Sequence, residues 1–221
     1  MAPTASVRIR LDTPTSNTMK KYESSIFECL TLEHAKDIVL TPDVNIPNKF
    51  EDYTRYFVDV ISDQLTINET TLIHDFGVGM GRVSKELIDR YKCKILGTDI
   101  SVNMLIHATN YVNNPQCFAT SNYVTYQNSF DVCIASLVLQ HVEHPMKEID
   151  NILHVLKPNG YLVCLNDYTK RYVPGDYRED NSIIWFDDHL NIFEYLDKKF
   201  KKVVEYSYPQ PDHKIVFYQK L

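Results

Sequence analysis

Three glycines cluster in one short segment of the sequence, where a ligand could reach the main chain. The chain holds only six glycines in 221 residues, and Gly77, Gly79 and Gly81 fall within five positions. The apolar run 71–76 before them predicts a buried strand, and the pattern over 81–92 predicts a helix. Glycines at such a turn permit a tight bend and let a ligand approach the backbone without meeting a Cβ atom.

A carboxylate follows at the end of the next predicted strand. Asp99 lies eighteen residues past Gly81 and ends the run 94–99. A carboxylate at this position can accept two hydrogen bonds from a ribose diol. Ile100 and Met104 come next and could hold an adenine between apolar surfaces. Three plainer interpretations stay open: a tight turn without a ligand, a carboxylate favoured only by a helix dipole, and a core methionine.

This pattern differs from two other nucleotide-binding loops. The dinucleotide fingerprint GxGxxG requires glycine at position 82, where the chain has Arg82. The Gly-Lys-Ser/Thr of a P-loop is also missing from the segment. The sequence therefore disfavours a nicotinamide- or flavin-dependent oxidoreductase and a nucleoside triphosphatase.

The elements that must position these residues alternate along the chain. We expect strands at 71–76, 94–99, 116–119, 131–136, 161–166, 203–208 and 214–219, with helices at 49–65, 81–92, 101–112, 145–156 and 187–200 and a turn at 157–160. Alternation of this kind predicts a mostly parallel sheet covered by helices on both faces. The last two strands are joined by only five residues, too few for a crossover helix, so they should form an antiparallel hairpin.

Several segments together resemble the class I S-adenosylmethionine-dependent methyltransferase family. The resemblance covers about residues 70–166, and more loosely the terminal hairpin, and is carried by segments 75–82, 97–101, 130–136, 139–142 and 156–160. It implies an α/β fold: a Rossmann-like, doubly wound, mostly parallel seven-stranded sheet with a C-terminal antiparallel hairpin and an N-terminal helical extension. It also implies a division of the single domain into an extension or lid at 1–70 and a cofactor-binding part at 71–221.

The resemblance implies S-adenosyl-L-methionine as cofactor and S-adenosyl-L-homocysteine as product. In this family Asp75 would lie near the methionine end of the cofactor and Asp99 would bind the ribose. The other implied cofactor contacts are Gly77, Val78 and Gly79 in the loop, Ile100, Met104, Thr120 and Ser121 around the adenine, and Ser136 and Leu137 beneath the methionine. Many members carry an acidic residue near Thr120 and Ser121, which this chain lacks.

Methyl transfer needs a base only if the acceptor must lose a proton during attack. His141 is the leading candidate base, although it could simply brace its loop, and Asp167 could orient an amine or hydroxyl acceptor. Candidate substrate contacts are Tyr53, Tyr56, Gln140 and Tyr168, of which the first two could equally be helix packing. His74 lies within a predicted strand and is expected to be a core residue.

Composition narrows the possible partners. The net charge of −6 and the lack of a basic face argue against nucleic acid, which is bound largely through its phosphates. The five cysteines show no CxxC spacing, so we expect buried free thiols and no metal site. The N-terminus lacks an apolar signal core and the longest apolar stretch is too short to span a membrane, so a cytoplasmic protein is expected. Monomer and homodimer both stay open.

Three functions follow from these observations. The first is a methyltransferase that acts on an oxygen or nitrogen atom of a small polar metabolite. The second is a non-catalytic S-adenosylmethionine-binding or scaffold protein on the same fold, which would have no physical need to keep an intact glycine loop and Asp99. The third is a nicotinamide oxidoreductase, which Arg82 and the terminal hairpin both disfavour.

Overall fold

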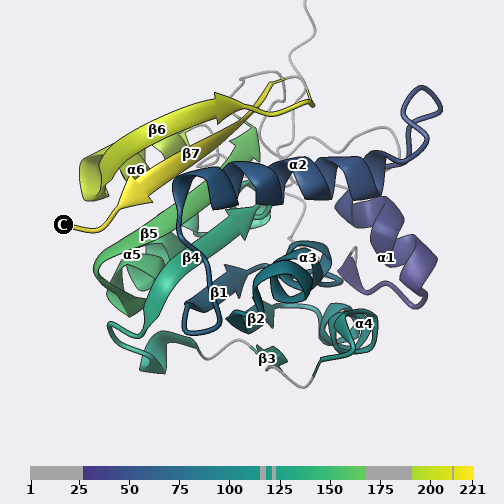
Figure 1. The fold of residues 1–221 in the computed structure, drawn as a ribbon, viewed down its shortest axis with the longest axis horizontal. Coiled ribbons are helices and arrows are strands. Elements are labelled where there is room, and N and C mark those ends of the chain that lie inside the picture. Colours follow the sequence, from purple (N-terminus) through teal and green to yellow (C-terminus); the bar gives the residue numbers. More distant parts are fainter. Residues whose placement is uncertain (1–26, 115–117, 121–122, 168–190, 211) are drawn as a thin grey trace, which may run out of the picture.

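A computed structural model describes residues 27–114, 118–120, 123–167, 191–210 and 212–221. Its strands form one sheet in the order β3-β2-β1-β4-β5-β7-β6 (Figure 1). Their bounds are β1 Leu72–Phe76, β2 Lys94–Asp99, β3 Phe118–Thr120, β4 Phe130–Ser136, β5 Leu156–Asp167, β6 Lys201–Ser207 and β7 His213–Gln219. Strands β1 to β5 pair in parallel, and β7 pairs antiparallel with both β5 and β6. The predicted mostly parallel sheet with a C-terminal antiparallel hairpin is confirmed.

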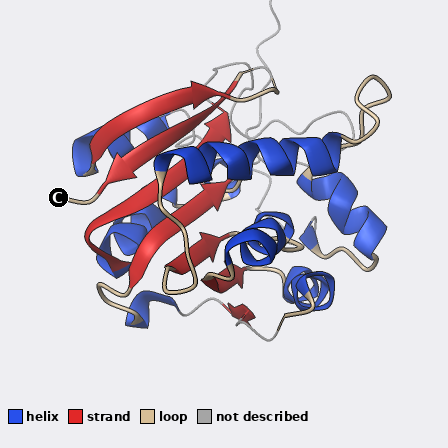
Figure 2. Ribbon diagram, in the orientation of Figure 1, coloured by secondary structure: helices blue, strands red, loops and turns tan. Residues whose placement is uncertain are grey.

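Helices cover both faces of this sheet, as Figure 2 shows. The helices are α1 Leu32–Val39, α2 Lys49–Gln64, α3 Arg82–Tyr91, α4 Val102–Val112, α5 Pro145–Val155 and α6 Ile192–Lys199, with short 3-10 helices η2 Tyr123–Thr125 and η3 Leu139–His141. One apolar core joins Phe57 of α2 and Leu87 of α3 to one face of the sheet. A second core joins Ile149 of α5 and Leu196 of α6 to the other face. The doubly wound arrangement is therefore confirmed.

Local chemistry explains where these helices begin and which side they bury. Helix α4 follows Ser101, whose hydroxyl accepts a hydrogen bond from the Met104 N–H at 3.2 Å, as its N-cap position predicts. Pro145 occupies the first turn of α5, where its missing N–H costs nothing. In α2, apolar residues recur at three- and four-residue spacing and the resulting face, which includes Phe57 and Ile61, is buried.

One boundary differs from its prediction. The turn expected at 157–160 lies inside β5, which begins at Leu156 rather than near Tyr161. The pairing with β4 jumps from Phe130–Leu156 to Val132–Tyr161, so the turn residues form a bulge in one longer strand. Asn159 within the bulge has a left-handed φ of 62°, which asparagine tolerates better than most residues. The composition of residues 157–160 correctly predicts an irregular backbone. That the irregularity lies inside a strand depends on the pairing of β5 with β4.

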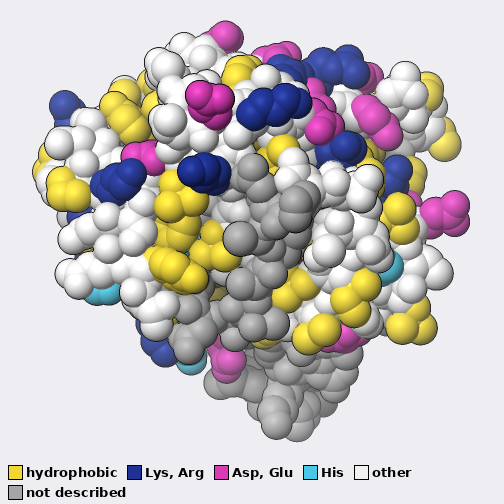
Figure 3. Space-filling model, turned by 60° about the horizontal axis from the view of Figure 1, so that its bottom comes forward, with side chains coloured by type: hydrophobic (Ala, Val, Ile, Leu, Met, Phe, Trp, Pro, Cys, Tyr) yellow, Lys and Arg dark blue, Asp and Glu magenta, His cyan; other side chains and the backbone are white. Residues whose placement is uncertain are grey.

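The described cysteines are buried, and some hydrophobic side chains are exposed. Cys29, Cys93, Cys133 and Cys164 are free and buried, as expected, whereas Cys117 lies outside the described residues. Hydrophobic side chains also gather on the face shown in Figure 3. Within the described part of the chain, no helix combines the length and the apolar character needed to cross a membrane.

Candidate functional site

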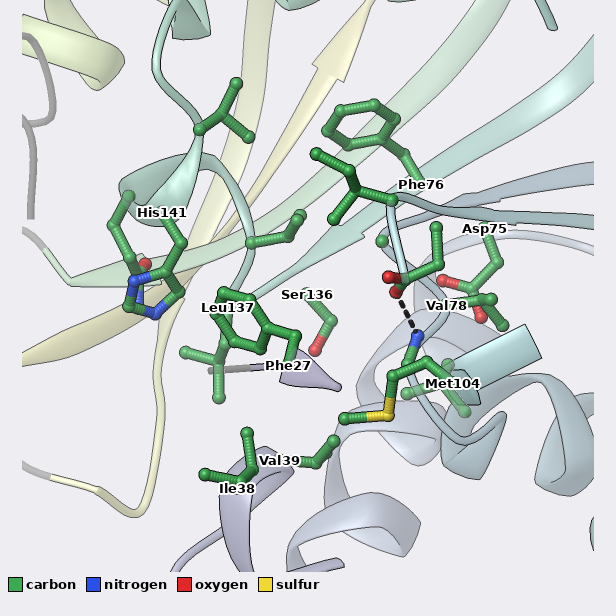
Figure 4. Close-up of a pocket in the computed structure, with 18 of the residues that line it drawn as sticks. Phe27, Ile38, Val39, Asp75, Phe76, Val78, Met104, Ser136, Leu137 and His141 are labelled. Carbon is green, nitrogen blue, oxygen red and sulfur yellow. Dashed lines mark hydrogen bonds between the residues drawn. The ribbon is translucent and has the colours of Figure 1, made fainter. Parts of the chain in front are cut away.

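A cavity of about 460 Å³ lies at the carboxyl ends of the central strands β1, β2 and β4. It brings together most of the predicted site residues: Asp75, Gly77, Val78, Gly79, Asp99, Ile100, Met104, Ser136, Leu137, Gln140 and His141. Figure 4 shows His141 at one end of the cavity, with Asp75 and Met104 toward the other. This is the edge of an α/β sheet at which ligands generally bind.

The glycine loop after β1 is held by its own hydrogen bonds. The N–H groups of Gly77 and Val78 both donate to the Thr98 carbonyl, at 2.8 and 2.9 Å. The N–H of Gly79 donates to Asp99 Oδ2 at 2.8 Å. A loop that binds pyrophosphate must aim such N–H groups at the ligand. Because these amides already have acceptors within the protein, the loop suits an uncharged part of a ligand better than a dinucleotide.

Gly77 marks the tightest point of this loop. Its φ of 69° lies in the left-handed region, and a Cβ atom there would come within 2.2 Å of Val138 Cγ2. Glycine is therefore required twice, by backbone conformation and by space. The contact joins the end of β1 to the segment that follows β4, which lies more than sixty residues later in the sequence.

Asp99 faces the cavity with both oxygens already anchored. Its Oδ2 accepts from Gly79 and its Oδ1 accepts from the Ser101 N–H at 2.9 Å. Burial raises the pKa of this carboxyl, and the backbone hydrogen bonds oppose that rise. Each carboxylate oxygen still has a second lone pair, so the anchored group can accept hydrogen bonds from a diol.

The two apolar residues after Asp99 line the same cavity in different ways. Ile100 is 62% exposed, whereas Met104 is 2% exposed and packs in a small core with Met80. Ile100 is thus open to a ligand, and Met104 offers a rigid apolar surface behind it. Together they fit the flat apolar faces of a base.

Asp75 and Arg82 occupy the buried end of the cavity. Ser84 Oγ donates to Asp75 Oδ2 at 2.6 Å, and burial, the largest effect, raises the pKa of Asp75 to about 6. Arg82 is 4% exposed, and its guanidinium donates to Thr54 Oγ1 and to Ser136 Oγ, each at 3.0 Å. Arg82 was not predicted as a site residue. Its only signal in the sequence was its place directly after the glycine loop.

The opposite wall comes from the segment after β4. Leu137 has a φ of 57° and its N–H donates to the Leu165 carbonyl at 2.7 Å, a conformation that costs energy for a residue other than glycine. Gln140 and His141 follow on η3. Gln140 is 3% exposed, and its Oε1 has no hydrogen-bond partner among the described residues. The His141 ring centroid lies 5.8 Å from that of Phe27.

Comparison with known proteins agrees with this geometry. The family model described as "Methyltransferase domain" matches residues 74–164. The chain is 26% identical over 127 residues to malonyl-[acyl-carrier protein] O-methyltransferase of Marinomonas sp.. The matched region covers 52% of this chain and 45% of that protein. The chain is 30% identical over 105 residues to phosphoethanolamine N-methyltransferase 2 of Caenorhabditis elegans. That matched region covers 44% of this chain and 24% of the relative.

Solved structures show the same fold at low identity. A SAM dependent methyltransferase from Aquifex aeolicus superposes with a TM-score of 0.61 at 16% identity, over 87% of this chain and 100% of that one. The PH0226 protein from Pyrococcus horikoshii gives a TM-score of 0.64 at 15% identity, over 79% and 92%. Residues 74–164 thus match a methyltransferase domain, and the chain has the fold of class I S-adenosylmethionine-dependent methyltransferases. It spans about half or less of the length of the curated relatives it matches.

The match to a methyltransferase domain implies S-adenosylmethionine as cofactor, and the residues present fit it. Asp99 supplies acceptors for two hydroxyl groups, while Ile100 and Met104 supply apolar surface for a base. The glycine loop uses its amides internally, as a cofactor without phosphate allows. Gln140 Oε1 is a buried acceptor that still needs a donor.

Some predicted residues of the methyltransferase site lie away from the cavity lining. Asp167 is buried at the end of β5, in register with His213. Tyr53 packs against Tyr208 with ring centroids 5.4 Å apart, and the Tyr56 hydroxyl donates to the Ser207 carbonyl at 2.9 Å. These side chains hold the hairpin and α2 together, and their roles in catalysis or substrate binding stay predictions.

Three further predicted contacts are at Thr120, Ser121 and Tyr168. Thr120 pairs with Asp99 in the backbone register of β3 and β2. Ser121 and Tyr168 lie outside the described residues. The contacts proposed for these three residues therefore stay predictions.

Sequence reasoning also missed several residues of the lining. Phe27, Ile38 and Val39 reach the cavity from the N-terminal extension, and Gln210 and His213 reach it from the hairpin. None lies near a recognisable motif, because each is brought to the site by the packing of an element that begins far away in the sequence. The hairpin signal alone pairs β7 with β6, but it does not place the first residue of β7 beside the cavity.

Proposed function

We propose that this chain transfers the methyl group of S-adenosylmethionine to an oxygen or nitrogen atom of a small polar metabolite. One observation carries the proposal: a single cavity joins an anchored carboxylate, Asp99, and an apolar slot to a polar end with Gln140 and His141. The first part suits a nucleoside, and the second suits an acceptor with hydrogen-bonding groups. The net charge of −6 favours a small acceptor over nucleic acid, and the proposal includes a cytoplasmic location.

The cofactor supplies a methyl group on a sulfonium, which a nucleophile displaces in line. The protein must then bind, orient and exclude water. In this proposal Asp99 binds the ribose, and Ser136 and Leu137, which line the same cavity, contact the methionine portion. Ile38 and Val39 of α1 close one side of the cavity, which supports the proposal that residues 1–70 act as a lid on a cofactor-binding part at 71–221.

His141 is the proposed base for an acceptor that must lose a proton. It lines the cavity on η3, and a histidine can take up a proton near neutral pH. Asp167, Tyr53, Tyr56 and Tyr168 stay secondary proposals for orienting the acceptor. The relatives that the chain matches include an O-methyltransferase and N-methyltransferases, which supports an oxygen or nitrogen acceptor here.

Binding of the cofactor product tests the proposal directly. S-adenosylhomocysteine should raise the melting temperature of the protein, and NAD should not, because only a ligand of the native state stabilises it. Replacing Asp99 with Ala should weaken S-adenosylhomocysteine by roughly a hundredfold, as expected for losing hydrogen bonds to a charged group. Differential scanning fluorimetry measures the shift in melting temperature, and isothermal titration calorimetry measures the loss of affinity.

A matched control separates a specific loss from a general one. Asp63→Ala removes an exposed carboxylate from α2 and should leave binding unchanged. The cofactor assignment would be wrong if Asp99→Ala bound as tightly as the wild type. Saturable binding without transfer to any amine, hydroxyl or carboxylate acceptor would instead favour a non-catalytic binding protein.

A further inference from the structure

Two amide oxygens are buried in the cavity without a hydrogen-bond donor from the described residues. They are Gln140 Oε1 and Gln210 Oε1, and both glutamines line the cavity. Gln140 is 3% exposed, so solvent reaches little of its side chain. A buried acceptor is costly unless a ligand or an ordered water supplies the donor. Two such oxygens in one cavity therefore indicate a ligand that carries hydrogen-bond donors.

Elements that are remote in the sequence bring the two glutamines to the same edge of the sheet. Gln140 lies on η3, which follows the carboxyl end of β4. Gln210 lies in the turn between β6 and β7, which is closed where the Tyr208 N–H donates to the His213 carbonyl at 3.2 Å. His213 begins β7 opposite Asp167, the last residue of β5, and β5 pairs in parallel with β4. Both amide oxygens therefore belong to the end of the cavity at β4 and β5.

The nucleoside of the proposed cofactor would occupy the other end of the cavity. Asp99 ends β2, and the strands β1 and β4 separate β2 from β5 in the sheet. Figure 4 shows His141, which follows Gln140 in the sequence, on the opposite side of the cavity from Met104. If the proposed function holds, the two glutamine oxygens face the methyl acceptor rather than the ribose or the adenine.

The number of donors distinguishes the nucleophiles that a methyltransferase can use. A neutral primary amine carries two N–H groups and keeps both while its lone pair attacks. A hydroxyl group carries one proton, which it loses during transfer, and a carboxylate carries none. A carboxylate would also place its own negative oxygens against those of the glutamines. Of these three nucleophiles, the primary amine alone can satisfy both oxygens throughout the reaction.

We propose that Gln140 and Gln210 accept hydrogen bonds from the two N–H groups of a primary amine, so that the methyl acceptor of this chain is a nitrogen atom. The inference rests on the proposed function and narrows its acceptor from oxygen or nitrogen to nitrogen. A primary amine is protonated at neutral pH, so it first gives one proton to His141 or to solvent.

Neutral amide oxygens suit the transfer step that follows. The amine nitrogen bonds to the methyl carbon through its lone pair, while the carbon–sulfur bond breaks and its electron pair stays on sulfur. The nitrogen thereby becomes a positively charged methylammonium. The negative ends of the two amide dipoles would face that developing charge, which favours the transition state over the neutral amine. A carboxylate in either place would instead bind the protonated amine, which has no lone pair for attack.

Probes tethered to the cofactor test the proposal without knowledge of the acceptor's skeleton. In each probe a nitrogen atom replaces the sulfur of S-adenosylhomocysteine and carries a 2-aminoethyl, 2-(dimethylamino)ethyl, 2-hydroxyethyl or n-propyl arm. Isothermal titration calorimetry measures the affinity of each probe for the wild type. We expect the aminoethyl probe to bind roughly tenfold tighter than the propyl probe, because it supplies donors to both oxygens. The dimethylamino and hydroxyethyl probes supply fewer donors and should bind more weakly than the aminoethyl probe.

Variants assign this preference to the two glutamines. Gln140→Met and Gln210→Met should each weaken the aminoethyl probe by roughly threefold or more, and the double variant should remove its advantage over the propyl probe. The affinities for S-adenosylhomocysteine and the propyl probe should stay within about twofold, because neither ligand supplies a donor to these oxygens. Gln64→Met, at an exposed glutamine that ends α2, should bind every probe like the wild type.

Several results would overturn the amine assignment. Equal affinity of the wild type for the aminoethyl and propyl probes would mean that water satisfies the oxygens. The assignment also fails if the advantage survives in the double variant, or if the hydroxyethyl probe binds as tightly as the aminoethyl probe. It fails as well if either variant weakens S-adenosylhomocysteine as much as the aminoethyl probe, because the oxygen would then bind the cofactor.

Failure of the proposed function gives a different result. A wild type that binds neither S-adenosylhomocysteine nor any of the probes would refute the cofactor assignment, and the amine inference that rests on it would fall too. A wild type that binds S-adenosylhomocysteine but shows no preference among the arms would refute the amine inference alone.

Discussion

Two walls of the cavity differ in whether their buried polar groups have hydrogen-bond partners within the protein. In the glycine-loop wall, residues 75–82 and 99–104, the Gly79 amide and the Asp99 carboxylate satisfy each other. In the η3 wall, residues 136–141, Leu137 adopts a left-handed φ and Gln140 Oε1 has no partner among the described residues. The loop amides and the carboxylate of the first wall have hydrogen-bond partners without a ligand, whereas the second wall contains an acceptor without a donor.

The difference has a functional meaning. A buried acceptor without a donor costs about 1–3 kcal/mol, which a protein recovers only when a ligand supplies the donor. The glycine-loop wall should therefore be rigid and should select ligands by shape. The η3 wall should lower the stability of the ligand-free protein and should select ligands that carry a hydrogen-bond donor. Substitutions that act on one wall, or on the contact between them, can test this contrast.

The largest effect is expected where the two walls touch. Gly77→Ala places a Cβ atom 2.2 Å from Val138 Cγ2 at a φ of 69°. Strain and overpacking together should lower the free energy of unfolding by about 4 kcal/mol. Gly79→Ala is the matched control, since its Cβ would meet only Val39 Cγ2 at 3.2 Å, and it should cost about 1–2 kcal/mol. Equal urea-denaturation midpoints for the two variants would show that the walls are not locked together at Gly77.

A second effect comes from the pKa of Asp75 in the glycine-loop wall. Burial raises this pKa from 3.8 to about 6, so the folded state holds the proton more tightly than the unfolded chain. The resulting stabilisation is present below about pH 4 and is lost as the pH rises through 6. Relative to Asp75→Asn, the wild type should therefore lose roughly 3 kcal/mol of unfolding free energy between pH 4 and pH 7.

The neighbouring His74 gives this experiment its control. Burial lowers the His74 pKa from 6.5 to about 3, so its contribution is present above pH 6.5 and is lost as the pH falls. The two opposite slopes should nearly cancel in the wild type between pH 4 and pH 6.5. Asp75→Asn should expose the His74 slope, with stability falling toward acid. Parallel urea-denaturation profiles for the two proteins would contradict the raised pKa of Asp75.

The smallest effect belongs to the η3 wall. Gln140→Met removes the unpartnered amide at similar volume and should raise the free energy of unfolding by about 1 kcal/mol. The same change should reduce methyl transfer while S-adenosylhomocysteine affinity stays constant. Gln64→Met, at an exposed glutamine that ends α2, should change neither quantity. A loss of stability in Gln140→Met would mean that the amide has a structural partner and that the contrast between the walls is false.

Much of the glycine-loop wall could be predicted because its causes are local. A left-handed φ, a capping serine and a carboxylate at a strand end all depend on residues close together in sequence, and Gly77, Ser101 and Asp99 lie where expected. Strand and helix periodicity likewise reflects which side each element buries. The short link before β7 required an antiparallel hairpin.

The remaining features depend on which distant elements pack together. Arg82 meets Thr54 of α2 and Ser136 of β4, although nothing in its own neighbourhood indicates either partner. His213 reaches the cavity, while Tyr53 turns toward Tyr208, because the hairpin pairs with β5 and α2 packs over the sheet. The sequence by itself determined the elements, the bend and the carboxylate. Only the tertiary structure decided which side chains share the cavity, since burial and pairing between remote segments are properties of the packed whole.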